Sequence, residues 1–202
     1  RHFASGFYFA SKFVWSKSLD ALNSGASNPQ YGPNVQAEYG QSDFNAGKVF
    51  KASGLYELPI GRGKAFLARS NAATNAVVSG WQASGVLTVQ SGLPFNASAN
   101  DLSNTGGNHA QRANQLCDGN RPDGQSIQSW FNTACYVQTG VGQFGSEQRN
   151  NILGPRTTNL DLSLFKSVAL REGRALQLRS DFFSALNHPL LGIPSSSVTS
   201  PT

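Results

Sequence analysis

Residues 80–93 read GWQASGVLTVQSGL, and this stretch decides the fold class. One set of alternate positions carries Trp81, Ala83, Gly85, Leu87 and Val89, and the other carries mainly Gln, Ser and Thr. A period of two is typical of a β-strand with one apolar and one hydrophilic face. The run exceeds the usual soluble strand of about 5 to 6 residues and matches the roughly 9 to 11 of a tilted membrane-crossing strand.

Four further stretches alternate in the same way, so we predict strands near 7–17, 48–59, 80–93, 159–170 and 175–187. Their apolar sets are Phe7, Phe9, Phe13 and Trp15; Phe50, Ala52, Gly54, Tyr56 and Leu58; Leu160, Leu162 and Leu164; and Leu176, Leu178, Phe182 and Leu186. Several aromatic residues stand near the ends of runs, where a membrane barrel has its interfacial girdles. Alternation alone also suits a soluble β-sandwich, whose apolar faces turn inward.

The hydrophilic faces of these strands supply the candidate functional residues. They are Lys12, Lys51, Glu57, Gln82, Gln90, Asp161, Arg179 and Asp181. In a large barrel such side chains line a hydrated lumen or contact a plug domain. In a soluble sheet they form a solvated face, so by themselves they identify no site.

The connections between the strands separate these alternatives better. Two are long, 19–47 and 94–158, and structureless loops beyond about 12 to 15 residues are uncommon in compact soluble domains. Outer-membrane barrels have long loops outside and short turns inside. We therefore expect an all-β, antiparallel meander of about five long strands, an incomplete segment of a large transmembrane β-barrel with two long extracellular loops.

The two shorter connections carry more specific expectations. The one that follows Pro59 contains Gly61 and Gly63 and is expected to include a short helix from Asn71 to Val78. The other is expected to be a three-residue hairpin loop, Glu172-Gly173-Arg174, with Leu164 facing Phe182 and Leu160 facing Leu186.

Lys166 is the awkward residue of the fourth strand, because it shares the parity of the apolar leucines. The expected register pairs it with Ser180. A lysine facing lipid at the bilayer midplane costs about 2 to 4 kcal/mol, and much less near the interface. We therefore expect Lys166 near the inner interface, with its aliphatic stem snorkelling.

Composition excludes two classes of protein. Hydrophobic residues make up 39% and charged residues 13%, yet no apolar run approaches the roughly 20 residues of a transmembrane helix. The net charge is +5, but the 16 basic residues are spread along the chain and form no nucleic-acid-binding motif. We expect no nucleic-acid partner.

Catalytic and metal-binding patterns were not found. His2, His109 and His188 have no metal-ligand spacing with other ligand types, and His188 is expected to end a strand. No Gly-x-Ser-x-Gly motif is present, and 61–64 (GRGK) lacks the spacing of a phosphate-binding loop. We expect no enzyme activity, no cofactor and no metal.

Cys117 and Cys135 are the only cysteines, and both lie in the second long loop. A disulfide between them is the favoured interpretation for an exported protein, and it would stabilise the fold by about 3 kcal/mol. Two free thiols are the alternative.

An ordered series of short motifs resembles the C-terminal barrel of Oar-like TonB-dependent receptors. The motifs are 14–20 (VWSKSLD), 37–44 (AEYGQSDF), 56–63 (YELPIGRG), 80–85 (GWQASG), 90–95 (QSGLPF), 130–134 (WFNTA), 149–155 (RNNILGP), 161–166 (DLSLFK) and 182–189 (FFSALNHP). Each is weak alone, but together they follow one order along nearly the whole chain.

The resemblance implies an outer-membrane receptor that takes up an unidentified substrate, with energy delivered by the periplasmic TonB protein. Its expected partners are outer-membrane lipid, the remainder of its own barrel and plug domain, and TonB, which would contact an N-terminal part outside these 202 residues. Five strands cannot close a barrel, so we expect an open sheet that does not transport alone. The alternative is a secreted β-sandwich that binds glycan or protein.

Overall fold

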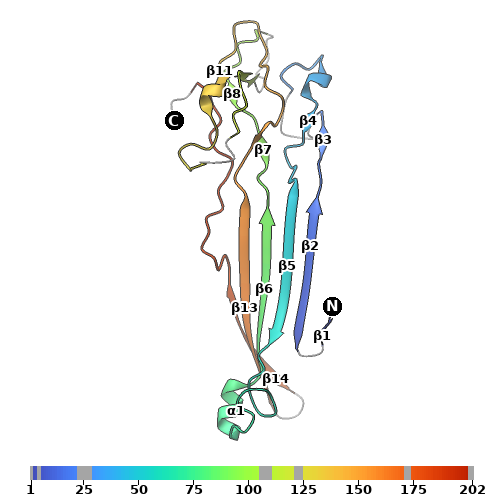
Figure 1. Ribbon diagram of the computed structural model, residues 1–202, viewed down its shortest axis with the longest axis vertical. Helices are drawn as coiled ribbons and strands as arrows, with labels where there is room; N and C mark the ends of the chain where they lie inside the picture. Colours follow the sequence, from blue (N-terminus) through green and yellow to red (C-terminus); the bar gives the residue numbers. More distant parts are fainter. Residues whose placement is uncertain are drawn as a thin grey trace. The chain divides into compact units, whose positions relative to one another are not determined.

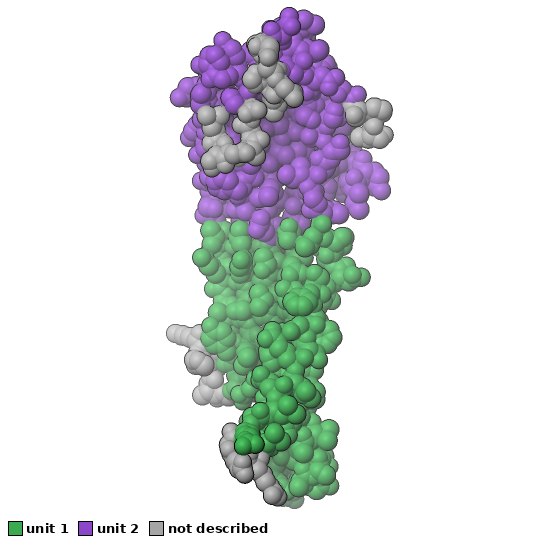
Figure 2. Space-filling model, turned by 180° about the vertical axis from the view of Figure 1, so that it is seen from behind, with its two compact units in different colours: residues 1–14, 49–89, 157–190 green, residues 15–48, 90–156, 191–202 purple. Residues whose placement is uncertain are grey.

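The computed structural model describes residues 2–3, 6–21, 29–104, 111–120, 125–170 and 174–199. These form two compact units, coloured separately in Figure 2. Unit 1 contains residues 1–14, 49–89 and 157–190, and unit 2 contains residues 15–48, 90–156 and 191–202. Each unit is described by itself below.

Unit 1 is built on one open antiparallel sheet, whose strands lie side by side in Figure 1. Its strand order is β1-β2-β5-β6-β13-β14. The bounds are His2–Phe3 for β1, Phe7–Trp15 for β2, Lys48–Glu57 for β5, Trp81–Gln90 for β6, Thr157–Ala169 for β13 and Ala175–Phe182 for β14. The predicted all-β meander of five long strands is confirmed, with β1 as a short addition.

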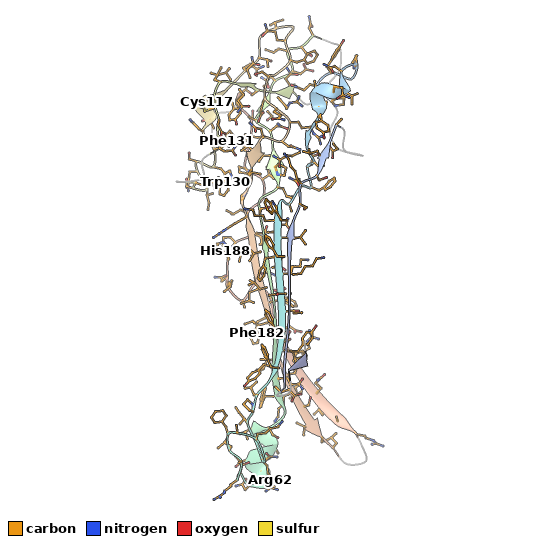
Figure 3. The ribbon with its side chains drawn as sticks, turned by 45° about the vertical axis from the view of Figure 1, so that its right-hand side comes forward. Arg62, Cys117, Trp130, Phe131, Phe182 and His188 are labelled. Carbon is orange, nitrogen blue, oxygen red and sulfur yellow. A yellow bond between two sulfur atoms is a disulfide. The ribbon has the colours of Figure 1, made fainter. Side chains whose placement is uncertain are left out.

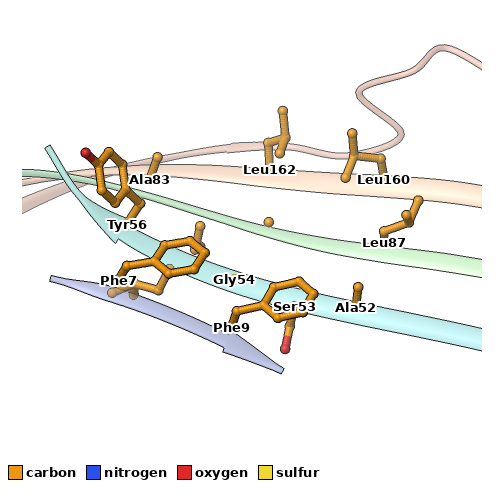
Figure 4. Close-up of a pocket in the computed structure, with 13 residues that line it drawn as sticks. Phe7, Phe9, Ala52, Ser53, Gly54, Tyr56, Ala83, Leu87, Leu160 and Leu162 are labelled. Carbon is orange, nitrogen blue, oxygen red and sulfur yellow. The ribbon is translucent and has the colours of Figure 1, made fainter. Parts of the chain in front are cut away.

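The predicted apolar face is present on one side of this sheet (Figure 4). Glycines in the middle strands make the face shallow there, with large side chains on either side. A Cβ on Gly85 would lie 3.0 Å from Leu162 Cδ2, and one on Gly54 would lie 3.9 Å from Phe9 Cδ2. The sheet thus places bulky residues beside glycines on this face. Phe9 and its neighbours remain exposed there.

The register of β13 and β14 differs from the expected one by two residues. Leu162, rather than Leu164, lies opposite Phe182. The faces are unchanged, because a shift of two preserves the parity of both strands. The last strand also ends at Phe182 rather than near residue 187, so Leu186 pairs with no strand residue and His188 does not end a strand.

Several expectations fall on parts of the chain that the structure does not describe. These are the hairpin residues Glu172 and Gly173, the residue His109, and the side chain of His2. The residues flanking the hairpin are described, and the Leu170 N–H donates to the Arg174 carbonyl at 2.7 Å.

The connection between β5 and β6 contains the expected helix, α1, at Ala72–Val78. It begins where the Asn71 side chain accepts a hydrogen bond from the Thr74 N–H, as preferred N-cap residues do. Gly61 and Gly63, both expected in a turn, have φ values of +126° and +74°, which favour glycine.

The register expected for Lys166 is wrong, and its side chain is buried, with 6% exposure. It lies opposite Leu178, not Ser180. Its Nζ donates to the carbonyls of Val77 and Ser79, and it stands 5.4 Å from the centre of the Trp81 ring. The ammonium group therefore bonds to carbonyls at the C-terminal end of α1, in the short connection, where positive charge is favourable. The expected place near the inner interface stays a prediction.

Unit 2 is formed mainly by the two long connections, and its regular elements are short. Four antiparallel pairs join β3 with β4, β7 with β12, β8 with β9, and β10 with β11. The bounds are Leu19–Asp20, Gly40–Gln41, Pro94–Phe95, Ile152–Leu153, Ser98–Ala99, Gln111–Arg112, Asn114–Gln115 and Tyr136–Val137, in that order of pairing, with 3-10 helices at Val35–Glu38 and Thr133–Cys135. The described parts of both long connections are thus folded rather than structureless.

Across the described residues, no helix combines the length and the apolar character needed to cross a membrane.

Candidate functional site

The predicted inner-face residues form two small groups and do not converge on one site. In one group the Gln82 side chain donates to Glu57 at 3.2 Å. In the other, Arg179 and Asp181 form an ion pair at 2.8 Å. Asp161 is held separately by Asn159 at 3.0 Å, near the end of β14.

Lys12 and Lys51 come from neighbouring strands and are both exposed. Hydrogen bonds from Ser16 N–H to the Gly47 carbonyl and from Glu57 N–H to the Gly6 carbonyl set the same register at both ends of β2 and β5. That register places the two lysines opposite each other, an arrangement that is unfavourable without a nearby anion. Gln90, at the end of β6, is half-buried and contacts neither of them through a hydrogen bond between described residues.

The hydrophobic core of the described residues lies in unit 2 and not in the sheet. Phe131 is at its centre, with ring centroids 5.7 Å from Phe95 and 5.6 Å from Tyr136, both edge to face. Ile152 closes the cluster at 1% exposure. The predicted disulfide joins Cys117 to Cys135 beside this core (Figure 3). Aromatic packing and a covalent bond therefore fix the second long connection.

A buried ion pair ties the two long connections together. Arg112, from the second, contacts Glu38, from the first, at 2.6 Å, and the two side chains are 8% and 5% exposed. Gln30 bonds to both residues, because its backbone N–H donates to Glu38 and its side-chain oxygen accepts from the backbone N–H of Arg112. The Arg112 guanidinium also donates to the Glu147 carbonyl at 2.9 Å. A buried pair is tolerated only when such additional hydrogen bonds satisfy the charges.

A second buried arginine repeats this arrangement. Arg149 contacts Asp20 and Asp43, both from the first long connection, the latter at 3.2 Å. Burial acts to raise the pKa of Asp20, but the hydrogen bond with Ser42 and the Arg149 guanidinium outweigh it and lower that pKa. Burial likewise acts to lower the pKa of Arg149, and the two carboxylates raise it. Both charges are therefore retained at neutral pH.

Glu147 is the buried carboxyl group with the least compensation. Its side chain is 2% exposed, and its two oxygens accept from the Ala97 N–H at 3.2 and 3.0 Å. Burial raises the pKa of Glu147 to about 7, although Ala97, Asn96 and Arg112 act in the opposite direction. This group changes its charge near neutral pH.

Unit 2 also contains an open pocket of 560 Å³. Its polar lining residues are Ser91, Asp118, Asn120, Gln125 and Arg156, and it includes Trp130, which Figure 3 labels. The Trp130 indole N–H donates to the Leu153 carbonyl at 2.7 Å, which holds the ring in place. The volume lies within the range of about 300 to 1,000 Å³ that is usual for small-molecule sites.

Comparison with protein families gives one match, to the outer membrane beta barrel domain, over residues 1–202. The chain belongs to this family. Its location is therefore the cell outer membrane. No curated protein and no solved structure matched the chain in the other two comparisons.

The alternation patterns in the sequence did not locate the buried ion pairs or the pocket of this barrel chain. The ion pairs of Arg112 and Arg149 join residues 74 and 129 positions apart, and no periodicity marks them. The pocket is lined by residues between 91 and 156, and five of them lie in three of the short motifs quoted above, 90–95, 130–134 and 149–155. Those motifs suggested a family but no pocket, whereas the cysteine pair indicated that the second connection is structured.

The described part of the barrel chain holds no group of three or more His, Cys, Asp or Glu side chains arranged to bind a metal ion. The arrangement in unit 2 can present fixed polar groups and an indole face to a ligand.

Proposed function

We propose that this outer-membrane barrel is a TonB-dependent receptor that takes up a substrate. The observation that carries the proposal is the fixed structure of the two long connections: the second holds an apolar core and a disulfide, and buried arginines of the second pair with carboxylates of the first. Function is concentrated in loops held by a rigid scaffold, and a barrel that only spans the membrane needs no buried charges in its loops. The ordered motifs that resemble Oar-like receptors supply the link to TonB.

The proposal gives each face of the sheet its own partner and places the TonB contact elsewhere in the protein. Lipid contacts the apolar face of the sheet, which includes Phe7, Phe9 and Leu162. The hydrophilic face, which carries Lys12 and Lys51, faces the remainder of the barrel and a plug domain. TonB contacts a part of the protein outside these 202 residues. We propose no nucleic-acid partner and no catalytic step.

The topology supports an orientation with the long connections outside the cell and the short ones on the periplasmic side. The long connections follow β2 and β6, which run in the same direction, and the short ones follow β5 and β13. Long loops outside and short turns inside are the rule for outer-membrane barrels. A secreted sandwich would need a second sheet over the apolar face, and the described residues form no such sheet.

Uptake is tested by comparing how cells deplete the compounds of a defined medium, measured by mass spectrometry. Four strains are needed: wild type, one without this protein, one without TonB, and one with Arg149→Met. We expect at least one compound whose depletion needs both the protein and TonB, and reduced depletion with Arg149→Met. Arg62→Met, an exposed arginine of the short connection, is the matched control and leaves depletion unchanged. Depletion that persists without TonB would refute the proposal.

A further inference from the structure

We propose that the pocket of unit 2 binds a short neutral oligosaccharide, with Trp130 as the stacking surface and Asp118 and Arg156 as the hydrogen-bonding groups. A sugar ring combines an apolar face of C–H groups with a rim of hydroxyl groups. A site for it therefore needs one aromatic face and a few fixed donors and acceptors.

Trp130 supplies the aromatic face. Its indole N–H is already used by the Leu153 carbonyl, so the ring cannot donate to a ligand and offers its π-face instead. The ring is half-buried and borders the pocket. A ring that is fixed before binding loses little conformational freedom on contact with a ligand.

Asp118 supplies an acceptor that stays charged. One carboxylate oxygen accepts from both the backbone and the side-chain amide of Asn120, each at 3.0 Å. The bond from the Asn120 backbone lowers the pKa of Asp118 most, and the bond from the Asn120 side chain adds to it. The other oxygen has no hydrogen bond among the described residues, so it is available to ligand hydroxyl groups. Asn120 also accepts from the Leu153 N–H and acts as a positioning residue.

Arg156 supplies donors and balances the charge. Its side chain is exposed, borders the same pocket and forms no ion pair within the described ranges. One carboxylate and one guanidinium give the pocket no net charge, which favours a neutral, hydroxyl-rich ligand over an anion or a cation. Gly92 and Gly154 complete the wall, and a Cβ on Gly92 would overlap the Gly154 carbonyl.

The pocket would give the proposed receptor its substrate class, so this role rests on the proposed function, whereas binding itself does not. Binding is measured on purified protein in detergent, without TonB and without transport. Loss of binding and loss of transport are therefore separate results.

The first experiment is an array of immobilised oligosaccharides, with neutral hexose and N-acetylhexosamine chains in one arm and sialylated or phosphorylated chains in another. We expect neutral chains to bind, and the same chains in free form to compete. Binding by charged chains alone, or by no chain at all, would overturn the proposal.

The second experiment compares variants by calorimetry with the best free trisaccharide from the array. Asp118→Asn keeps an oxygen for the Asn120 bonds, and Arg156→Gln removes an exposed side chain, so both variants should fold. We expect Kd to rise about tenfold or more for each, since a lost hydrogen bond to a charged group has that size. Lys64→Gln, an exposed residue of the short connection, is the control and leaves Kd unchanged. Unchanged Kd in both variants, with circular dichroism like wild type, contradicts the site.

Discussion

Replacing Glu147 by Gln should remove most of the pH dependence of unit 2 stability between about pH 4.5 and 7. Burial raises the pKa of this carboxyl from 4.5 to about 7. In that window the folded unit keeps a proton that the unfolded chain has released. Stability from this group is therefore fully present below pH 4.5 and is lost as pH rises toward 7. A shift of about 2.5 units corresponds to about 3 kcal/mol.

The window separates Glu147 from Asp20, a partly exposed carboxyl group whose pKa is also shifted. Asp20 has a lowered pKa, so its contribution is present at neutral pH and is lost only as pH falls below the ordinary range of an aspartate. A rise in stability on moving from pH 7.5 to pH 5 therefore does not come from Asp20, and its loss in Glu147→Gln assigns it to Glu147. In Glu147→Gln the amide oxygen still accepts from the Ala97 N–H, and the charge is absent at every pH.

Hydrogen exchange measured by mass spectrometry reports this effect locally. Peptides that contain Ala97 should be about 100-fold better protected at pH 5 than at pH 7.5, after correction for intrinsic exchange rates. Glu147→Gln should show nearly equal protection at both values. Glu57→Gln, a carboxyl group of β5, is the matched control and should keep the wild-type difference. An undiminished difference in Glu147→Gln, or greater wild-type protection at pH 7.5, refutes the reasoning.

Three further predictions concern orientation and packing. In intact cells, Gln128→Cys, in the second long connection, should react with a membrane-impermeant maleimide. Lys64→Cys, in the short connection after β5, should react only after the outer membrane is opened. The reverse pattern would mean that the barrel has the opposite orientation. Gly92→Ala should lower the stability of unit 2 by about 1 to 3 kcal/mol in thermal unfolding, whereas Gly32→Ala, which has open space around it, should change it little. Lys166→Met should destabilise unit 1 by about 2 kcal/mol, because it removes charged hydrogen bonds to the end of α1, and a midpoint equal to wild type would contradict this.

The strands were predictable because their signal is local. The alternation around Leu87 and around Leu162 is set by the two-residue repeat of the backbone, and one apolar face is enough to reveal it. The register of β13 and β14 was not predictable from that signal, because pairing Phe182 with Leu162 or with Leu164 preserves the same faces.

The bonding partners of Lys166 were not predictable for a different reason. The prediction used only its own strand, where its parity points to lipid. The structure covers it with the end of α1, and the compensating groups are backbone carbonyls at Val77 and Ser79. Every residue has a backbone carbonyl, so the sequence does not show which carbonyls bond to a lysine, and such a lysine appears unpaired.

The core and ion pairs of unit 2 lay beyond sequence reasoning because they depend on contacts between distant residues without regular spacing. Glu38 and Arg112 are 74 positions apart, and each looks like an ordinary surface charge. The cysteine pair was the exception, since an even count in an exported chain limits the pairing to one possibility.

The two units follow opposite rules of solvation, which in the proposed receptor would separate ligand recognition from membrane insertion. Every residue of β14 is exposed, and Phe182 keeps 54% of its surface accessible, so the sheet needs hydrocarbon or barrel neighbours. Unit 2 instead closes its apolar core and buries charges such as Arg112 only as pairs, as a water-exposed domain does. Since the pocket residue Asp118 belongs to neither the alternation nor the core, substitution there alters recognition while leaving the strand pattern that directs membrane insertion intact.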